Sequence, residues 1–321
     1  MKTAFLFPGQ GSQFVGMGKG FCRKYGAAFE DTFTEASDAL GFNLKQVCFE
    51  GPERELTKTE YAQPAIVTVS VGIYRLLMNE GIAPSVVAGH SVGQFSALVA
   101  AGVLPFAEAV RLVRKRGLCM AAVAQKGGMA AVVMSKPEQR AALIETIHEM
   151  EVDVASYNTP SQMVVSGAVD NIQRIVEYLN NQAGVRTKPL AVSHAFHSRL
   201  MAEMEAELMT YVKELHFNDA SIPLVLNGNA KAVTCMNEIV NDIRDQCTQP
   251  VLWDQSMNTL HDLGVSQVIE VGASSTLIGM MRAIGYDWQT AAVDTPMTLE
   301  KLLRTERVYR NLEHEGRAAI V

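Results

Sequence analysis

Apolar and polar positions follow two different periods along this chain of 321 residues. Short apolar runs bounded by glycine or proline predict buried strands, among them 3–7 (TAFLF), 85–90 (SVVAGH), 222–228 (IPLVLNG) and 267–272 (QVIEVG). Longer stretches repeat their apolar positions about every 3.6 residues and predict helices, the clearest of which begins at Pro105. Strands that alternate with helices in this way indicate an α/β protein whose large domain is built on a parallel sheet.

A second set of elements lies within residues 127–197. The apolar pattern there predicts strand, helix, strand, strand, helix and strand in succession, with the last strand at 187–193 (TKPLAVS). This βαββαβ order is that of a ferredoxin-like unit. We therefore expect a small ferredoxin-like domain at 127–197, inserted into a large domain made of residues 1–126 and 198–321. A helical tail is expected after about residue 295.

One stretch, from Gly81 to Ala107, contains no charged residue and is long enough to suggest a membrane span. It also contains Pro84, His90 and Gln94, and a helix facing lipid would have to hide such groups. We therefore interpret the run as a core strand followed by a core helix, and we expect no membrane insertion.

The composition is that of a globular protein able to bury a sizeable core, with 48% hydrophobic and 19% charged residues. The formal net charge of −6 offers no basic field, so nucleic acid is not expected as a partner. The five cysteines include no C-x-x-C pair and have no histidine at metal-binding spacing. This usage favours reduced thiols in a cytoplasmic protein without a metal site.

Candidate chemistry lies where the strand at 85–90 ends, in the sequence GHSVG around Ser91. A serine with a glycine two positions before it and another two positions after it, on a tight turn from strand to helix, is typical of a nucleophile elbow. The helix N-terminus would bring the N–H of Val92 beside the serine hydroxyl, where it could hold an oxyanion. The alternative is a chance match at an ordinary helix N-cap, which the preceding strand and following helix make the weaker interpretation.

A second glycine-rich loop, PGQGSQFVGMG, follows the first strand at residues 8–18. Its spacing fails the dinucleotide-binding pattern, because Phe14 stands where the third glycine should be. We interpret the loop as a second source of backbone N–H groups for the oxyanion.

The residues alone leave the base and the carboxylate-binding group undecided. His194 and His197 both lie at a strand–helix junction from which a side chain can reach a cleft, and spacing does not choose between them. Arg114 and Arg116 fall on opposite flanks of the helix that begins at Pro105, and either could bind a substrate carboxylate with its planar fork. Both arginines could equally be solvated surface residues, and no aspartate stands out as a third triad member.

Three segments in this order resemble the malonyl-CoA:acyl carrier protein transacylases, which include the acyltransferases of fatty acid and polyketide synthesis. They are FPGQGSQFVGMG at the N-terminus, GHSVGQFSALVAAG around Ser91 and VSHAFHSRLM around His197. The resemblance continues through YAQPAI, VRKRG, YNTPSQMVVSG, QPVLW and VIEVG, and covers the chain to about residue 285. It implies a large α/β-hydrolase-like domain with an inserted small domain.

The resemblance also implies an activity and assigns roles to three side chains. By it the enzyme moves a malonyl group from coenzyme A to the phosphopantetheine thiol of an acyl carrier protein, through an acyl-serine intermediate. Ser91 is then the nucleophile, His197 its base and Arg116 the group that binds the malonyl carboxylate. Malonyl-CoA and the carrier protein are the expected partners, and no permanently bound cofactor is expected. The alternatives are an acyl hydrolase of the same fold and an inactive docking subunit.

Four further residues take supporting roles by the same resemblance: Gln10, Val92, Gln246 and Phe196. The backbone N–H groups of Gln10 and Val92 would form the oxyanion hole, and the carbonyl of Gln246 would orient the histidine. Phe196 would fill the space that an α-methyl group needs, and so favour malonyl. One departure is Gln94, where the family usually has glutamate. It suggests a specialised branch, such as a free-standing acyltransferase of a polyketide assembly line.

Overall fold

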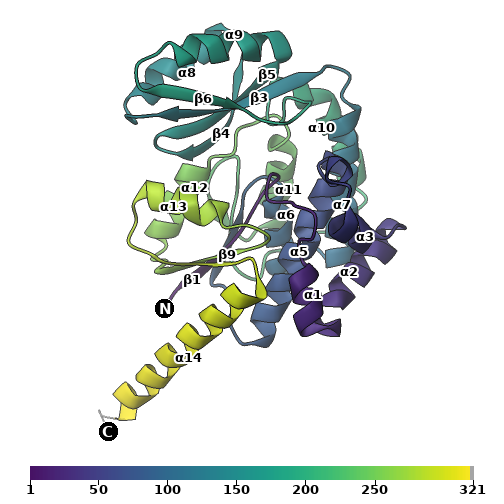
Figure 1. Cartoon of the computed structure of the whole chain (residues 1–321), viewed down its shortest axis with the longest axis vertical. Helices are drawn as coiled ribbons and strands as arrows, with labels where there is room; N and C mark the ends of the chain where they lie inside the picture. The colour runs from purple at the N-terminus through teal and green to yellow at the C-terminus, as the bar shows by residue number, and fades with distance from the viewer. Residues whose placement is uncertain (319–321) are drawn as a thin grey trace.

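The computed structural model describes residues 1–318, with side chains through residue 308. The chain forms two parts, each a sheet with helices packed on it (Figure 1). We call residues 127–189 the small layer and the rest of the fold the large layer. The C-terminal helix extends away from the large layer. The strands are β1 (Thr3–Phe7), β2 (Val86–Gly89), β3 (Gly127–Met134), β4 (Asp153–Thr159), β5 (Gln162–Ala168), β6 (Val185–Pro189), β7 (Leu224–Val225), β8 (Ala232–Val233), β9 (Gln267–Val271) and β10 (Gln289–Val293). The helices are α1 (Lys19–Tyr25), α2 (Ala27–Leu40), α3 (Leu44–Glu50), α4 (Glu53–Leu56), α5 (Thr59–Asn79), α6 (Gly93–Ala100), α7 (Phe106–Ala122), α8 (Gln139–Glu149), α9 (Val169–Asn180), the 3₁₀ helix η1 (Arg199–Met201), α10 (Ala202–Val212), α11 (Met236–Asp245), α12 (Trp253–Asp262), α13 (Thr276–Ile284) and α14 (Pro296–Ala318).

Six strands form the large sheet in the order β10-β9-β1-β2-β7-β8. The first five run parallel, but β8 pairs antiparallel with β7 at one edge, so the sheet is mixed rather than wholly parallel. The strand expected at 222–228 is only Leu224–Val225, because the chain soon turns back to form this short edge hairpin.

The strand β1 explains why the large sheet is buried on both faces. All five of its residues are buried, and successive side chains point to opposite faces. Phe5 and Phe7 pack into one core with residues of α2, α5, α6 and α7, whereas Ala4 and Leu6 pack into another with α12 and α13. A strand that packs into two cores needs apolar side chains on both faces, and this is why a short continuous apolar run predicts a buried strand.

The uncharged run Gly81–Ala107 forms β2 and α6 in the middle of the large layer. Every residue of β2 is buried, and so are seven of the eight residues of α6. Within the described part of the chain, no helix has both the length and the apolar character that a membrane crossing requires.

The small sheet has four antiparallel strands in the order β4-β5-β3-β6, with α8 and α9 against one face (Figure 1). Its elements follow one another in the order that the apolar pattern predicts. The last strand is Val185–Pro189 rather than 187–193, because the chain leaves the sheet after Pro189 and returns to the large layer. A separate apolar core fills the space between this sheet and its helices.

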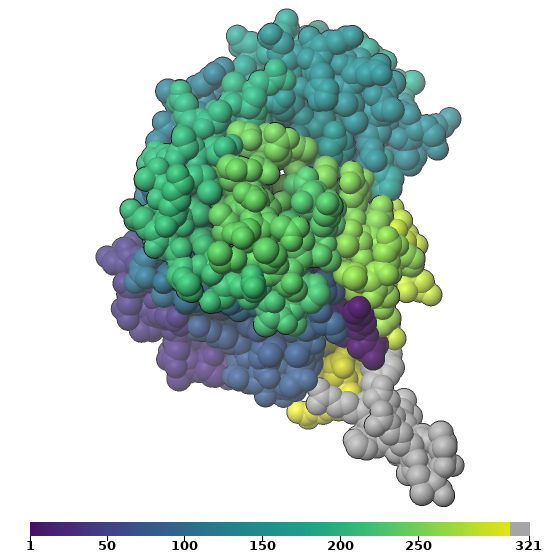
Figure 2. All heavy atoms as spheres, turned by 180° about the vertical axis from the view of Figure 1, so that it is seen from behind, coloured from purple at the N-terminus to yellow at the C-terminus, as the bar shows by residue number. Residues whose placement is uncertain are grey.

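The small sheet is joined to the large layer along β4. Backbone hydrogen bonds run from Tyr157 N to Val251 O and from Val251 N to Ala155 O, both at 2.9 Å. Two ion pairs also cross between the layers: Arg140 with Asp254, and Arg199 with Asp153. Seen from behind, the chain that follows the small sheet (green) covers much of the face between that sheet and the first helices (Figure 2). These contacts fix the small layer at the carboxyl edge of the large sheet.

Candidate active site

Ser91 lies on a sharp turn between the end of β2 and the start of α6. Its backbone φ of +52° is in the left-handed region, which a residue with a side chain occupies only when its surroundings enforce it. A Cβ at Gly89 would lie 2.1 Å from the carbonyl carbon of Gly93, and one at Gly93 would lie 2.1 Å from the carbonyl oxygen of Phe7. Only glycine fits at these two positions, and the turn therefore holds the serine at the carboxyl edge of the sheet.

His197 approaches this serine from the connection between β6 and η1. Its Nε2 lies 2.7 Å from Ser91 Oγ, and its Nδ1 lies 2.8 Å from the carbonyl oxygen of Gln246. A carbonyl oxygen only accepts, so Nδ1 carries the proton and Nε2 can take one from the serine. The backbone φ of His197 is +55°, so both members of the pair have left-handed conformations.

The imidazole of His197 is held in its neutral form. Burial, followed by the nearby charge of Arg116, lowers its pKa from 6.5 to about 3, although the hydrogen bond to Gln246 acts in the opposite direction. A neutral imidazole that contacts a hydroxyl is the arrangement of a general base beside a nucleophile. The main-chain carbonyl occupies the place that an aspartate has in a serine–histidine–aspartate triad.

Arg116 lies beside the serine–histidine pair and is only 2% exposed. Its Nη2 donates to Gln246 Oε1 at 3.0 Å and lies 3.4 Å from Ser91 Oγ, while its Nη1 donates to Gln63 Oε1 at 2.8 Å. Among side chains through residue 308, no carboxylate forms an ion pair with this guanidinium. Burial lowers the pKa of Arg116 to about 10, so it remains a cation at neutral pH. A buried cation with only neutral partners can accept an anionic group.

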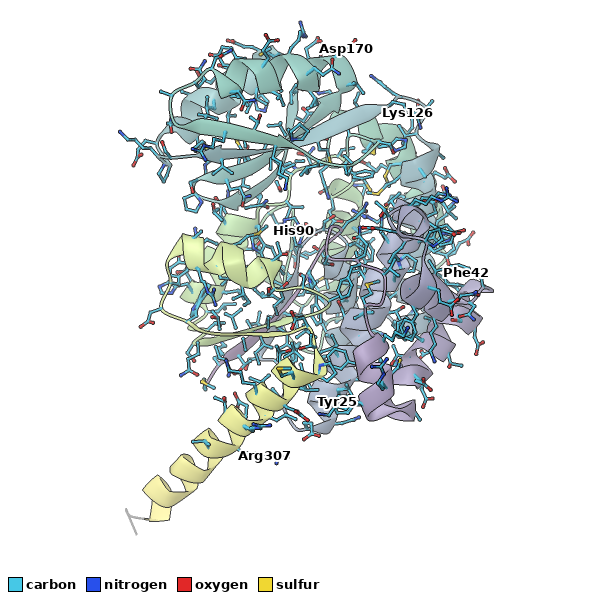
Figure 3. The ribbon with its side chains drawn as sticks, viewed as in Figure 1. Tyr25, Phe42, His90, Lys126, Asp170 and Arg307 are labelled. Carbon is cyan, nitrogen blue, oxygen red and sulfur yellow. The ribbon has the colours of Figure 1, made fainter. Side chains whose placement is uncertain are left out.

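The other candidate side chains lie apart from this cluster. Arg114 lies over an aromatic ring of α5, with its guanidinium carbon 4.4 Å from the ring centroid. His194 Nε2 lies 3.3 Å from Lys126 Nζ. His90, which Figure 3 shows between the two layers, places its Nε2 2.9 Å from Asn158 Oδ1 on the small sheet. Among these candidate arginine and histidine side chains, only those of Arg116 and His197 lie within hydrogen-bond distance of the Ser91 hydroxyl.

The first glycine-rich loop packs directly on the serine turn. A Cβ at Gly9 would lie 2.6 Å from the carbonyl oxygen of His90, so the two turns touch through their backbones. Within residues 1–318, the backbone N–H groups of Gln10 and Val92 donate to no other group of the protein. Both donors are thus available to a ligand beside Ser91.

A cleft of about 430 Å³ opens next to this loop. Gln10, His194 and Phe196 line it, and two basic side chains, Arg54 and Lys58, stand at its wall. The Phe196 side chain is 9% exposed. A group of three or more side chains able to ligate a metal is not found in the part of the chain that the structure describes. The cleft therefore brings the loop residue Gln10 together with two basic side chains and one acidic side chain, Glu60.

Two buried amide residues of the site, Asn227 and Gln63, were not predicted from the sequence, and Gln246 was predicted only for its backbone carbonyl. Asn227 Oδ1 accepts the Ser91 N–H at 2.8 Å, and its Nδ2 donates to the Gly89 carbonyl at 2.7 Å. The side chains of Gln63 and Gln246 both accept from Arg116. Asn227 had a signal, because it follows β7, the neighbour of β2, at the carboxyl edge where ligands meet α/β sheets. Gln63 lies inside α5 within the segment YAQPAI, which carries part of the resemblance but assigned this residue no role.

Comparison with known proteins identifies the family. Residues 4–295 match the acyl transferase domain family. The malonyl CoA-acyl carrier protein transacylase of Bacillus subtilis strain 168 is 38% identical to this chain, over 95% of this chain and 97% of that protein. The polyketide biosynthesis malonyl CoA-acyl carrier protein transacylase PksC of the same strain is 36% identical, over 88% of this chain and 97% of that protein.

A solved structure gives the same result. It is described as a type II PKS acyl-carrier protein in complex with its malonyl-transacylase, and it matches with a TM-score of 0.89 and 34% sequence identity. The match covers 95% of this chain and all of the other. The mixed sheet with a separate antiparallel sheet is thus the fold of these relatives. The resemblance seen in the sequence is confirmed: this chain belongs to the acyl transferase domain family, among the malonyl CoA-acyl carrier protein transacylases.

Proposed function

We propose that this protein is a malonyl-CoA:acyl carrier protein S-malonyltransferase. The observation that carries the proposal is Arg116, a buried cation whose Nη2 lies 3.4 Å from the Oγ of Ser91. A serine–histidine pair alone serves many acyl transfers, but a buried guanidinium without a carboxylate partner favours an acyl group that brings its own carboxylate. The names of the relatives, which describe malonyl transfer to acyl carrier proteins, support the same substrates.

The first half of the reaction loads the enzyme. Ser91 Oγ attacks the thioester carbonyl carbon of malonyl-CoA while His197 Nε2 takes the hydroxyl proton. The backbone N–H groups of Gln10 and Val92 bind the oxyanion, each contributing about 3 kcal/mol to the transition state. The carbon–sulfur bond breaks, the CoA thiolate takes the proton from the histidine, and a malonyl ester of Ser91 remains.

The second half reverses these steps with a different thiol. The phosphopantetheine thiol of the carrier protein gives its proton to His197 and attacks the ester carbonyl. The carbon–oxygen bond then breaks, and Ser91 Oγ recovers the proton. Arg54 and Lys58 beside the cleft supply positive charge that an acidic carrier protein or the phosphates of CoA would meet. Gln246 keeps the histidine in the required tautomer in both halves.

Arg116 sets the preference for malonyl over neutral acyl groups. A malonyl carboxylate would form charge-assisted hydrogen bonds with the guanidinium, whose partners within the protein are neutral amide, hydroxyl and thioether groups. An acetyl group would leave the cation buried without an anion, which is costly at such a site. Phe196 at the cleft wall would add selection against an α-methyl substituent. Hydrolysis by the same pair is not favoured, because water needs no carboxylate-binding group.

The proposal includes the architecture, the cell compartment and the pathway. We propose an α/β-hydrolase-like large domain at 1–126 and 198–321 and a ferredoxin-like small domain at 127–197, a description supported by the strand order β4-β5-β3-β6. The five cysteines are all free, which suits a protein of the reducing cytoplasm. Gln94 and the similarity to PksC favour a free-standing supplier of malonyl groups for polyketide synthesis.

The test is intact-protein mass spectrometry after mixing with malonyl-, methylmalonyl- or acetyl-CoA. The wild type should gain one malonyl group, and Ser91→Ala should gain none. In Arg116→Ala, the ratio of malonyl to acetyl loading should fall about 100-fold, because malonyl loses its ion pair. Arg114→Ala is the matched control, since Arg114 lies on the same helix outside the site and should keep the wild-type ratio.

Transfer is measured separately, by adding a phosphopantetheinylated carrier protein to the malonyl enzyme. The malonyl group should move to the carrier faster than it is lost to water. An Arg116→Ala enzyme with an unchanged acyl ratio would remove the arginine from its proposed role. A malonyl enzyme that releases free malonate at the same rate with and without carrier would instead establish a hydrolase.

A further inference from the structure

Gln94 is the residue that departs from the glutamate usual in the family, and it lies at the start of the helix that follows Ser91. It is fully buried, and its Nε2 donates a hydrogen bond of 2.7 Å to Asp242 Oδ2 on α11. These two residues are 148 positions apart in the chain. The place where glutamate is expected therefore holds an amide, and an acid stands directly opposite it.

The Asp242 carboxylate is buried without a cation. It is 3% exposed, and no ion pair to it exists among side chains through residue 308. Three donor contacts make up its shell: the Gly228 N–H at 2.8 Å on Oδ1, the Asn227 N–H at 3.2 Å on Oδ2, and the Gln94 amide. A buried carboxylate is tolerated only when such donors satisfy it, so each donor matters to its placement.

Asp242 connects the two halves of the catalytic pair. On one side it holds Asn227, whose side chain accepts the Ser91 N–H and donates to the Gly89 carbonyl. On the other side it precedes Gln246 by one helical turn, and its own carbonyl accepts the Gln246 N–H at 2.8 Å. The carbonyl of Gln246 then orients His197. The Asp242 carboxylate thus anchors the serine turn through Asn227, while the backbone carbonyl of Asp242 holds the residue that fixes the histidine.

We propose that Asp242 is a positioning residue for the Ser91–His197 pair, and that Gln94 and Asp242 form an interdependent amide–carboxylate pair in which each residue requires the other. This inference rests on the proposed function, because it concerns the same serine and histidine. It explains the departure at position 94 as one half of a matched pair, with the negative charge carried on α11 instead of α6.

The hydrogen bonds explain why position 94 must be an amide here. Gln94 Nε2 donates to Asp242, while Gln94 Oε1 accepts from the Asn227 N–H at 3.2 Å and from Gln246 Nε2 at 3.4 Å. A carboxylate at position 94 would retain the acceptors but would lose the donor to Asp242, so the two facing carboxylates would repel each other until one of them took up a proton. The reversed pair, Gln94→Glu with Asp242→Asn, has the same charge and again sets one amide donor against one carboxylate.

Four proteins test this: wild type, Gln94→Glu, Asp242→Asn and the double variant. Single-turnover loading with malonyl-CoA should be slowed about 30-fold in each single variant, because like groups then face each other. The double variant should return to within about threefold of wild type. Asp245→Asn is the matched control, since Asp245 lies on the same helix and is about half exposed. It should load at the wild-type rate.

Two readouts separate positioning from mere folding. The half-saturating malonyl-CoA concentration should change less than twofold in the single variants while the maximal loading rate falls, because Arg116 and the cleft are untouched. If a single variant is not obtained folded, recovery of folded, active protein in the double variant supports the same dependence. A double variant no faster or better folded than the worse single variant overturns the proposal, as does Gln94→Glu loading at the wild-type rate.

Labelling of Ser91 by a fluorophosphonate gives the same comparison without an acyl donor. It reports how well the histidine activates the serine, whatever the natural acyl group is. A wild type that reacts with the fluorophosphonate but takes no malonyl group would refute the proposed function. The rescue pattern in labelling rates would still decide whether the pair positions the serine and histidine.

Discussion

The two sheets of this protein use their buried space in opposite ways. At the carboxyl edge of the large sheet, buried polar groups gather around Ser91, and both Ser91 and His197 have left-handed backbones. The core of the small sheet is formed by apolar residues such as Val165 and Ile175. The large layer thus has strained backbone and a buried charge without an ion pair around Ser91, whereas the small layer has an ordinary apolar core. The difference indicates that the small sheet and its two helices cover the site, whereas the chain that leaves this sheet after Pro189 brings His197 to the serine.

The contacts between the layers agree with this division. Asn158 of the small sheet reaches His90, the neighbour of the serine, at 2.9 Å. It does not reach Ser91 or His197 through any hydrogen bond found in the described residues. Variants in the two layers should therefore separate reaction rate from stability.

The largest effect on rate is expected from His197→Ala. Without the base, malonyl loading at Ser91 should slow by about 10³-fold, measured by rapid quench and intact mass. The fold should remain, because the residue lies on a connection rather than in a sheet. His194→Ala is the matched control, since it removes the neighbouring imidazole that does not contact the serine, and it should load within about threefold of wild type. Equal losses in the two variants would contradict the assignment of the base.

The largest effect on stability is expected in the other layer, from Ile175→Ala. Ile175 is fully buried in the core of the small sheet, and its truncation should lower the free energy of unfolding by about 2 to 5 kcal/mol. The loading rate per folded molecule should stay within about twofold, because the cavity opens far from the serine. Urea unfolding and loading assays on the same samples measure both, with Glu177→Ala on the exposed side of α9 as control. A loss of rate without a loss of stability would show that the small layer takes part in the reaction.

The lowered pKa of His197 predicts that stability and the reactivity of Ser91 respond differently to pH. The folded protein lowers the pKa of His197 to about 3 from 6.5, chiefly through burial. Between these values the unfolded chain binds a proton that the folded protein does not, so the free energy of unfolding should fall as the pH drops from about 6.5 towards 3. Fluorophosphonate labelling of Ser91 should change less than about twofold between pH 7.5 and 5.5, because the free base stays neutral. A midpoint near 6.5 would mean that the histidine is not shielded as the structure indicates.

Features encoded locally were predictable from the sequence, and those that depend on distant contacts were not. The turn at Ser91 is visible because the strand, the two glycines and the helix are contiguous. The support for that turn is not, because Asn227 is 136 residues from Ser91 and Asp242 is 148 from Gln94. Periodicity predicted the order of elements in the small layer, but it began the last strand two residues late and ended it four residues late. It did not predict the antiparallel β8, because a strand of two residues leaves no apolar period to recognise.

The smallest effect is expected from the ion pair of Arg199 and Asp153, which crosses between the layers. Arg199 is more than half exposed, so Arg199→Ala should lower the free energy of unfolding by only about 0.2 to 1 kcal/mol. Lys45→Ala, which breaks an exposed pair within the large layer, is the control and should cost a similar amount. Malonyl loading should stay within twofold in both variants, because the backbone hydrogen bonds at Val251 still hold β4 against the large layer. A tenfold slower loading in Arg199→Ala alone would mean that this exposed pair, rather than the backbone junction, holds the small layer over the site.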